Sequence, residues 1–155
     1  MNEEFYIDFD GVIMDTQGDT DRLFMEYGGD IKNPAWNEYL RCREWANYLL
    51  TCKEIDNSID VLKELYKLKK RVYILSRVFS VNEARDKTLF LRDKGVYQDF
   101  IAVPGRISKS KVVIPNKSRL LVDDSNDNVI DWRNNKGSAI LIPNEEKDLS
   151  FLLKR

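Results

Sequence analysis

The sequence predicts an α/β fold, a Rossmann-like three-layer α/β/α domain with a mostly parallel sheet of about five strands and a small helical cap insertion. Segments with strand and helix patterns alternate along most of the chain, which is typical of βα units. Two apolar strand segments run directly into paired acidic residues. The interval between the first two strands is longer than one helical crossover requires, and this length predicts the insertion.

Length and composition agree with one compact domain. The chain has 155 residues, of which 43% are hydrophobic and 33% charged, and such a chain can bury a sizeable core. With 25 basic and 26 acidic residues, its net charge is −1, so its overall electrostatic field does not favour binding to nucleic acid or to an anionic membrane. No apolar run approaches the roughly 20 residues of a membrane span, and the first residues lack the features of a secretory signal. We therefore expect a cytoplasmic protein without a membrane or nucleic-acid partner, and the sequence leaves open whether it forms a homodimer.

The first predicted strand, residues 4–10, carries two acids. Its apolar residues have the aromatic and β-branched character of a buried strand. Side chains alternate along a strand, so Asp8 and Asp10 point to the same side. Gly11 then permits a sharp turn. Two carboxylates beside an open turn suit Mg²⁺, although a chance acid at a strand edge followed by an ordinary turn remains the alternative.

Residues 17–54 are the predicted cap, and residues 1–16 and 55–155 the predicted core domain. A helix is expected over about 35–51, while Gly28-Gly29 and Asn33-Pro34 divide the segment into short pieces. Three arginines of the cap are candidates for contacting an anionic substrate: Arg22, Arg41 and Arg43. The segment is also rich in aromatic residues, namely Phe24, Tyr27, Trp36, Tyr39, Trp45 and Tyr48. We expect most of these rings to pack between helices and one or two to be available for stacking on a nucleobase.

The middle of the chain predicts two further βα units. Residues 55–69 have the apolar periodicity of an amphipathic helix, followed by a strand over 71–76. A helix is predicted over 80–94 and a strand over 99–103. Four basic residues lie at the end of the helix predicted over 55–69: Lys67, Lys69, Lys70 and Arg71. We interpret their positive charges as complementing the helix terminus rather than binding a polynucleotide.

The last third of the chain contains the second acidic cluster. An apolar strand over 118–123 ends in Asp123 and Asp124, and a helix over 127–135 and a strand over 138–142 follow. Ligands of open α/β sheets collect outside the carboxyl ends of strands, so we expect the two acidic clusters to meet there. Coulomb repulsion makes such a meeting unfavourable without a bound cation.

The chain contains no histidine. This absence excludes Ser-His-Asp and Cys-His hydrolase mechanisms and the common His-based zinc sites within the chain. Cys42 and Cys52 are the only cysteines, too few for a disulfide scaffold. No GxxxxGK[ST] motif is present, which excludes a P-loop kinase. Proton transfer therefore falls to Asp, Glu, Lys, Tyr or water, and Asp10 is well placed for it.

Four short motifs follow one another along the chain: Asp8-Phe9-Asp10-Gly11-Val12, Leu75-Ser76, a lysine at Lys109 or Lys111, and Asp123-Asp124. In this order they resemble the motifs of the haloacid-dehalogenase-like phosphohydrolase superfamily, over nearly the whole chain. The first and fourth motifs together are specific for this superfamily. The serine and the lysine are weak matches alone, and their order and context strengthen them.

The resemblance implies a mechanism through a covalent aspartyl phosphate. Asp8 would attack phosphorus, and Asp10 would serve as general acid and base. A lysine, Lys109 or Lys111, would offset negative charge at the nucleophile. The implied phosphate contacts are Ser76, Arg77 and Gly11.

The resemblance also implies Mg²⁺ as the cofactor. Its implied ligands lie at the two strand ends: Asp8, Asp10 through its backbone carbonyl, and the pair Asp123 and Asp124, with Asp124 as the direct ligand by the family pattern. Asp127 and Asn128 are candidates for supporting the metal ligands. Alternatively, Asp127 helps to cap the helix that begins there.

Within the superfamily, the chain is most similar to the 5'(3')-deoxyribonucleotidases and related small phage and bacterial nucleotidase-like proteins. This closer resemblance rests on the first motif and on residues 122–132, where a helix with an early Asn and Trp132 follows the acid pair. It implies a Mg²⁺-dependent phosphate monoester hydrolase acting on small phosphorylated substrates, (deoxy)nucleoside monophosphates in the first place. The alternatives are another small phosphate ester, a nucleic-acid 3'-phosphate, and a non-catalytic relative that binds or regulates.

Overall fold

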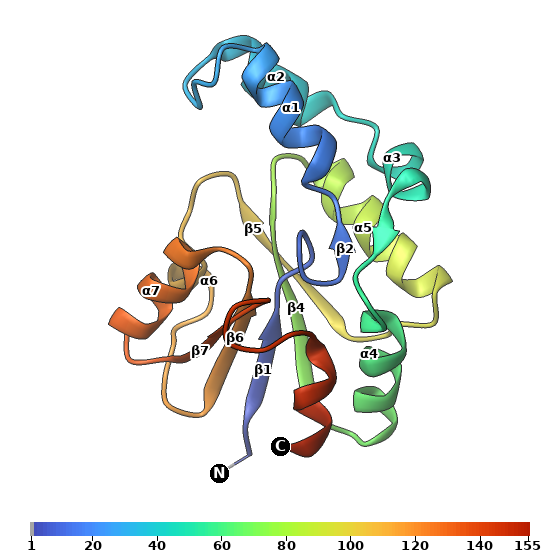
Figure 1. Cartoon of the computed structure of the whole chain (residues 1–155), viewed down its shortest axis with the longest axis vertical. Coiled ribbons are helices and arrows are strands. Elements are labelled where there is room, and N and C mark those ends of the chain that lie inside the picture. Colours follow the sequence, from blue (N-terminus) through green and yellow to red (C-terminus); the bar gives the residue numbers. More distant parts are fainter. Residues whose placement is uncertain (1) are drawn as a thin grey trace.

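A five-stranded parallel sheet forms the centre of the protein (Figure 1). The structure is a computed structural model, which describes residues 2–155. The strands pair in the order β5-β4-β1-β6-β7. They span Glu4–Ile7 (β1), Arg71–Val78 (β4), Asp99–Pro104 (β5), Arg119–Asp123 (β6) and Ser138–Leu141 (β7). The predicted α/β fold class is confirmed, with β1 at the centre of the sheet.

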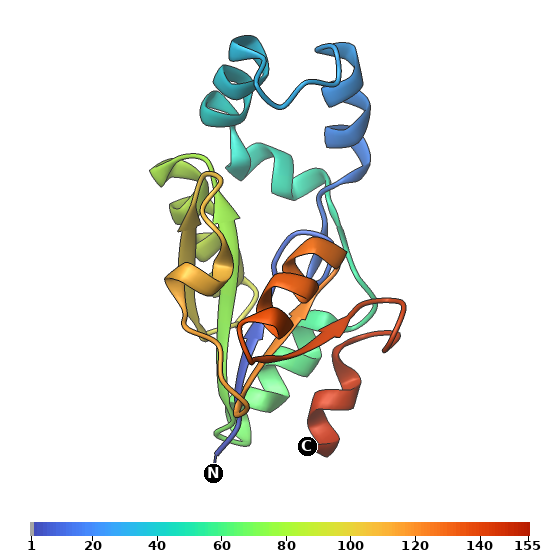
Figure 2. The same cartoon turned by 90° about the vertical axis from the view of Figure 1, so that its left-hand side faces the viewer.

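Helices cover both faces of the sheet, because alternate residues of each strand are apolar on opposite sides. On one face, Phe5 and Ile7 pack in a cluster with residues of three helices: α4 (Ser58–Lys67), α5 (Val81–Asp93) and the C-terminal 3₁₀ helix η1 (Leu149–Lys154). On the other face, Tyr6 packs with Val129 and Trp132 from α7 (Asn126–Asn134), which lies beside the short α6 (Lys109–Val112). Figure 2 views the molecule from the side of α6 and α7.

The first strand ends earlier than the sequence predicts, at Ile7 instead of residue 10. The carbonyl of Phe9 accepts hydrogen bonds from the amides of Ile13 and Met14, and Gly11 N–H donates to the carbonyl of Met14 at 2.9 Å. These bonds fold residues 9–14 into a tight loop. Asp10 therefore lies on this loop, whereas Asp8 directly follows the strand and its amide still donates to the carbonyl of Val122 at 2.9 Å.

The cap contains three helices where one was expected over 35–51. They span Gly18–Glu26 (α1), Pro34–Cys42 (α2) and Trp45–Thr51 (α3). Pro34 begins α2, with the Asn33 side chain accepting from Ala35 N–H, as is common at a helix start. The predicted single helix is wrong because Arg43 adopts an extended conformation, with ψ of 131°. Its guanidinium carbon lies 3.4 Å from the centre of the Tyr48 ring, and its Nη1 donates to Thr20 Oγ1 at 2.7 Å.

The chain enters and leaves the cap through two short antiparallel strands, β2 (Met14–Asp15) and β3 (Lys53–Glu54). Figures 1 and 2 show the cap beyond the carboxyl ends of the central strands, and both ends of the chain at the opposite pole. Among residues 2–155, no helix combines the length and the apolar character that crossing a bilayer requires. The cap thus lies over the edge of the sheet where β1, β4 and β6 all end.

Candidate active site

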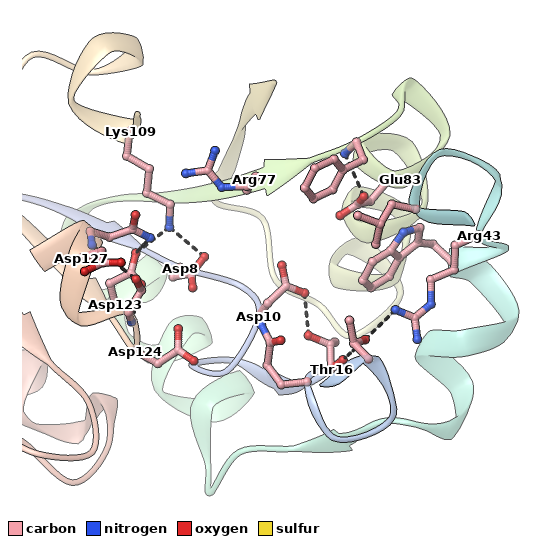
Figure 3. Close-up of a pocket in the computed structure, with 17 residues that line it drawn as sticks. Asp8, Asp10, Thr16, Arg43, Arg77, Glu83, Lys109, Asp123, Asp124 and Asp127 are labelled. Atoms are coloured by element: carbon pink, nitrogen blue, oxygen red, sulfur yellow. Dashed lines mark hydrogen bonds and ion pairs between the residues drawn. The ribbon is translucent and has the colours of Figure 1, made fainter. Parts of the chain in front are cut away.

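A pocket of about 360 Å³ lies between the carboxyl end of the sheet and the cap (Figure 3). Its core side is acidic, whereas its cap side is formed by Leu40, Arg43 and Trp45. The pocket contains most of the residues that the sequence singled out: Asp8, Asp10, Arg77, Lys109, Asp123, Asp124, Asp127 and Asn128. Residues from opposite ends of the chain thus meet at one edge of the sheet.

Lys109 connects the two acidic strand ends. Its Nζ donates to Asp8 Oδ1 at 2.8 Å and to Asp123 Oδ2 at 2.6 Å, and its side chain is buried. Burial lowers the pKa of Lys109, but the charges of Asp8 and Asp123 outweigh that effect and raise it above its ordinary value. Lys111, two positions further along the same short helix, is exposed. Between the two lysines that the sequence offered, the geometry therefore favours Lys109.

Three carboxylates converge where the sequence predicts a metal. One oxygen each of Asp8, Asp123 and Asp124 lies within 4.8 Å of the others. Burial, followed by the charge of Asp123, raises the pKa of Asp8 well above its usual range. The same two causes raise the pKa of Asp124 to about 6. Clustered oxygen donors that repel one another fit a hard divalent cation such as Mg²⁺.

The two neighbouring acids of β6 have different partners. Both oxygens of Asp123 are bonded, Oδ2 to Lys109 and to Asn128 Nδ2 at 3.2 Å, and Oδ1 to Ser125 N–H at 2.9 Å. Asp124 instead faces the loop after β1. A Cβ on Gly11 would lie 2.0 Å from Asp124 Oδ2, so glycine at this position makes room for the carboxylate. Asp124 is therefore the freer of the two acids for a metal.

The start of α7 supports this arrangement. Ser125 is its N-cap residue, and its Oγ accepts from Asn128 N–H. The side chain of Asn128 donates to Asp123, and its support of a metal site stays a prediction. Asp127 lies in the first turn of α7 and lines the pocket.

Asp10 is held from two sides. Thr16 Oγ1 donates to its Oδ1 at 2.6 Å, and Lys87 Nζ donates to its Oδ2 at 2.8 Å. Sequence reasoning missed Lys87, which is fully buried on α5. The available signal was the spacing of Glu83, Lys87 and Leu91, which places two charged residues on the same helix face as a core leucine.

The three predicted phosphate contacts have other partners in this structure. Ser76 is fully buried, and its hydroxyl lies 3.3 Å from Lys87 Nζ. Arg77 lines the pocket, but its Nη1 donates to the carbonyls of Gly105 at 2.6 Å and Ile107 at 2.8 Å. The amide of Gly11 donates to Met14. Phosphate contact by these residues stays a prediction.

No protein-family model matches the sequence, and no curated protein matches it. Solved structures do match. The HAD domain of effector protein Lem4 from Legionella pneumophila, in an inactive mutant form, is 17% identical with a TM-score of 0.56, over 99% of this chain and 91% of that one. A hydrolase from Pseudomonas syringae is 12% identical with a TM-score of 0.62, over 99% and 90%.

A HAD-superfamily hydrolase from Ehrlichia chaffeensis is 14% identical with a TM-score of 0.52, over 91% of this chain and 88% of that one. At such low identities the likeness concerns the fold. The chain therefore has the fold of haloacid-dehalogenase-like hydrolases along almost its whole length.

Proposed function

We propose that this chain, with the fold of haloacid-dehalogenase-like hydrolases, is a Mg²⁺-dependent phosphate monoester hydrolase that works through an aspartyl phosphate. The proposal rests on one observation above all. Asp8 opens into the pocket beside Asp10, and its carboxylate is paired with the buried ammonium of Lys109. A nucleophile, a proton donor and a charge-compensating cation are thus adjacent, as covalent phosphoryl transfer requires.

In the proposed reaction, an oxygen of Asp8 bonds to phosphorus while the bond from phosphorus to the ester oxygen breaks. Asp10 gives its proton to the departing oxygen. It then takes a proton from a water molecule, whose oxygen attacks the aspartyl phosphate and releases inorganic phosphate and free Asp8. Lys109 compensates charge at the nucleophile throughout.

The residues that would hold Mg²⁺ are Asp8, the Asp10 carbonyl and Asp124, with Asp123 and Asn128 behind them. When bound there, Mg²⁺ compensates negative charge on the phosphoryl oxygens. Asp123 keeps Lys109 in place through its 2.6 Å bond. Asn128 fixes the orientation of Asp123 in turn.

For the substrate, we propose nucleoside or deoxynucleoside monophosphates. The support comes from the walls of the pocket, which combine apolar Leu40, Trp45 and Phe79 with polar Gln17 and Thr20 beside the acidic end. A flat apolar base and a polar sugar are compatible with such walls. Another small phosphate ester, a nucleic-acid 3'-phosphate or a purely binding role are the competing outcomes of the test.

The test is phosphate release from a panel of nucleoside monophosphates, sugar phosphates and 3'-phosphorylated oligonucleotides, with Mg²⁺ and with EDTA. We expect Mg²⁺-dependent release that is highest with nucleotides and absent in Asp8→Asn. Wild-type activity in Asp8→Asn contradicts the proposed mechanism. Preference for sugar phosphates or oligonucleotides contradicts the nucleotide assignment alone, and no release from folded protein with Mg²⁺ favours the binding role.

A further inference from the structure

We propose that Lys87, paired with Glu83, is a positioning residue that fixes the carboxyl group of Asp10 for proton transfer to the leaving group. This inference rests on the proposed function, since it concerns the same reaction. Lys87 does not line the pocket, so it acts through Asp10 and not on the substrate.

The geometry joins three elements at one nitrogen. Lys87 Nζ donates to Asp10 Oδ2 at 2.8 Å, on the loop after β1, and to Glu83 Oε2 at 2.6 Å, one turn earlier on α5. It also lies 3.3 Å from Ser76 Oγ and 3.4 Å from the carbonyl of Arg77, both on β4. An ammonium has three donors, and here each direction finds an acceptor.

The Asp10 carboxyl is consequently bonded at both oxygens, to Lys87 on one and to Thr16 on the other. The two donors come from different parts of the chain and prevent the carboxyl group from rotating. Each carboxylate oxygen retains a second acceptor position. Proton transfer depends strongly on such alignment, because donor and acceptor must be within hydrogen-bond reach.

The position of Lys87 makes a purely structural role a poor explanation. Its side chain is fully buried, with Nζ 4.3 Å from the centre of the Trp45 ring and 5.2 Å from that of Phe9. An apolar residue of similar length would fill this space without the cost of desolvating an ammonium. Glu83 compensates part of that cost. Lys87 also bonds to Asp10, 77 positions away in the sequence. If the Glu83–Lys87 pair only stabilised α5, it would not need this contact.

The test compares two esters of similar shape that differ in their need for a proton. The para-nitrophenolate ion leaves readily without one, whereas the alkoxide of para-nitrobenzyl phosphate needs protonation. Lys87→Met preserves volume and removes the ammonium. We expect its kcat/KM, which reports phosphoryl transfer from the ester to Asp8, to fall about 10²-fold on para-nitrobenzyl phosphate, within the range for general acid catalysis, and much less on para-nitrophenyl phosphate.

Two further variants make the comparison decisive. Lys94→Met makes the same chemical change at an exposed position at the end of α5 and should leave the ratio of the two rates unchanged. Glu83→Gln/Lys87→Met removes both charges and keeps an acceptor for Phe79 N–H, which Glu83 Oε1 binds at 3.0 Å. The double variant carries the test if Lys87→Met alone does not fold.

Equal loss on both esters, or no loss, in folded Lys87→Met or in the double variant overturns the inference. A wild-type protein that releases no phosphate from either ester, nor from the nucleotide panel, overturns instead the proposed function on which the inference depends. If the ratio of the rates on the two esters changes in Lys87→Met but not in Lys94→Met, the positioning role of Lys87 is supported.

Discussion

Gly11 allows two acidic segments to approach each other. Its φ of +79° belongs to the left-handed region that favours glycine, and the Asp124 carboxylate occupies the space that a Cβ would need. The glycine thus acts through its missing side chain: it permits both the tight loop after β1 and the position of the freer acid of β6.

We predict that Gly11→Ala weakens Mg²⁺ binding and destabilises the protein by roughly 1 to 3 kcal/mol, because the backbone is strained and Asp124 must move. Calorimetric titration with Mg²⁺ and thermal unfolding measure the two effects. Gly18→Ala is the matched control, since nothing lies within 4 Å of its added Cβ. Equal Mg²⁺ affinity of the two variants would show that Asp124 is not a ligand.

The raised pKa of Asp124 predicts a pH-dependent stability. The folded protein holds this proton more tightly than the unfolded chain, so without metal it loses stability as the pH rises from 3.8 through about 6. Asp124→Asn lacks this loss. In EDTA, we expect wild type and variant to unfold at similar temperatures near pH 4, and the variant to become the more stable one by pH 7. A difference in unfolding temperature between wild type and variant that does not change with pH contradicts a raised pKa of Asp124.

Single residues of the site differ in how well the sequence predicts them. The acids are predictable because apolar strand patterns end at Asp8 and Asp123, and the carboxyl ends of parallel strands meet at one edge. Lys87 and Thr16 were not predicted, since their contacts with Asp10 depend on how α5 and the cap pack. Arg77 was proposed to bind phosphate, yet its bonds to Gly105 and Ile107 arise from a loop whose path no local pattern indicates.

At the scale of elements, the loop between β5 and α6 links the core to the cap. Arg77 of β4 holds this loop through two of its carbonyls. Arg106, within the loop, donates to the carbonyl of Ile31 at 2.8 Å and to Asn37 Oδ1 at 2.9 Å, both in the cap. The same loop ends at Ser108, the residue before Lys109. One short segment therefore both contacts the cap and leads into Lys109, in addition to the packing of α3 against α5.

We predict that Arg106→Met increases hydrogen exchange of the amides in residues 28–40, because the variant loses its donors to the cap. Exchange in α4 should stay unchanged, since the core keeps its packing. Global stability should change by less than about 1 kcal/mol, as Arg106 is exposed. Mass spectrometry of exchanged peptides measures the difference, with Arg85→Met on the exposed side of α5 as control. Identical exchange in 28–40 would mean that these bonds do not hold the cap.

The strands of the central sheet and helices α4, α5 and α7 were predicted to within a few residues, whereas α6, η1 and the separate cap helices were not. Core strands and helices have clear periodicity, and the ends of β4, β6 and α5 follow from it. The cap helix over 35–51 looked continuous because both halves are apolar and neither contains glycine or proline after Pro34. Its break at Arg43 is caused by contacts with Thr20 and Tyr48, which a local pattern does not contain.

At the scale of the molecule, the converging carboxylates would couple binding of the proposed Mg²⁺ to folding. Asp8 follows β1 and Asp124 follows β6, so the unfolded chain cannot present them together. We predict that Mg²⁺ raises the unfolding temperature of the wild type, by the equivalent of about 2.7 kcal/mol when its concentration is 100 times Kd. Asp124→Asn should show little of this rise. Equal Mg²⁺ stabilisation of both proteins would place the ion elsewhere.

The paired strands β2 and β3 have a consequence for how such a protein can diversify. Asp15 pairs with Lys53, so the chain leaves the core and returns to it at adjacent positions. Residues 18–42, which contain α1 and α2, can be exchanged for a longer or shorter segment while Thr16 keeps its bond to Asp10 and Trp45 and Leu49 stay in the core. Under the proposed function, substrate preference can therefore evolve, or be engineered by grafting, while the groups proposed for phosphoryl transfer remain as they are.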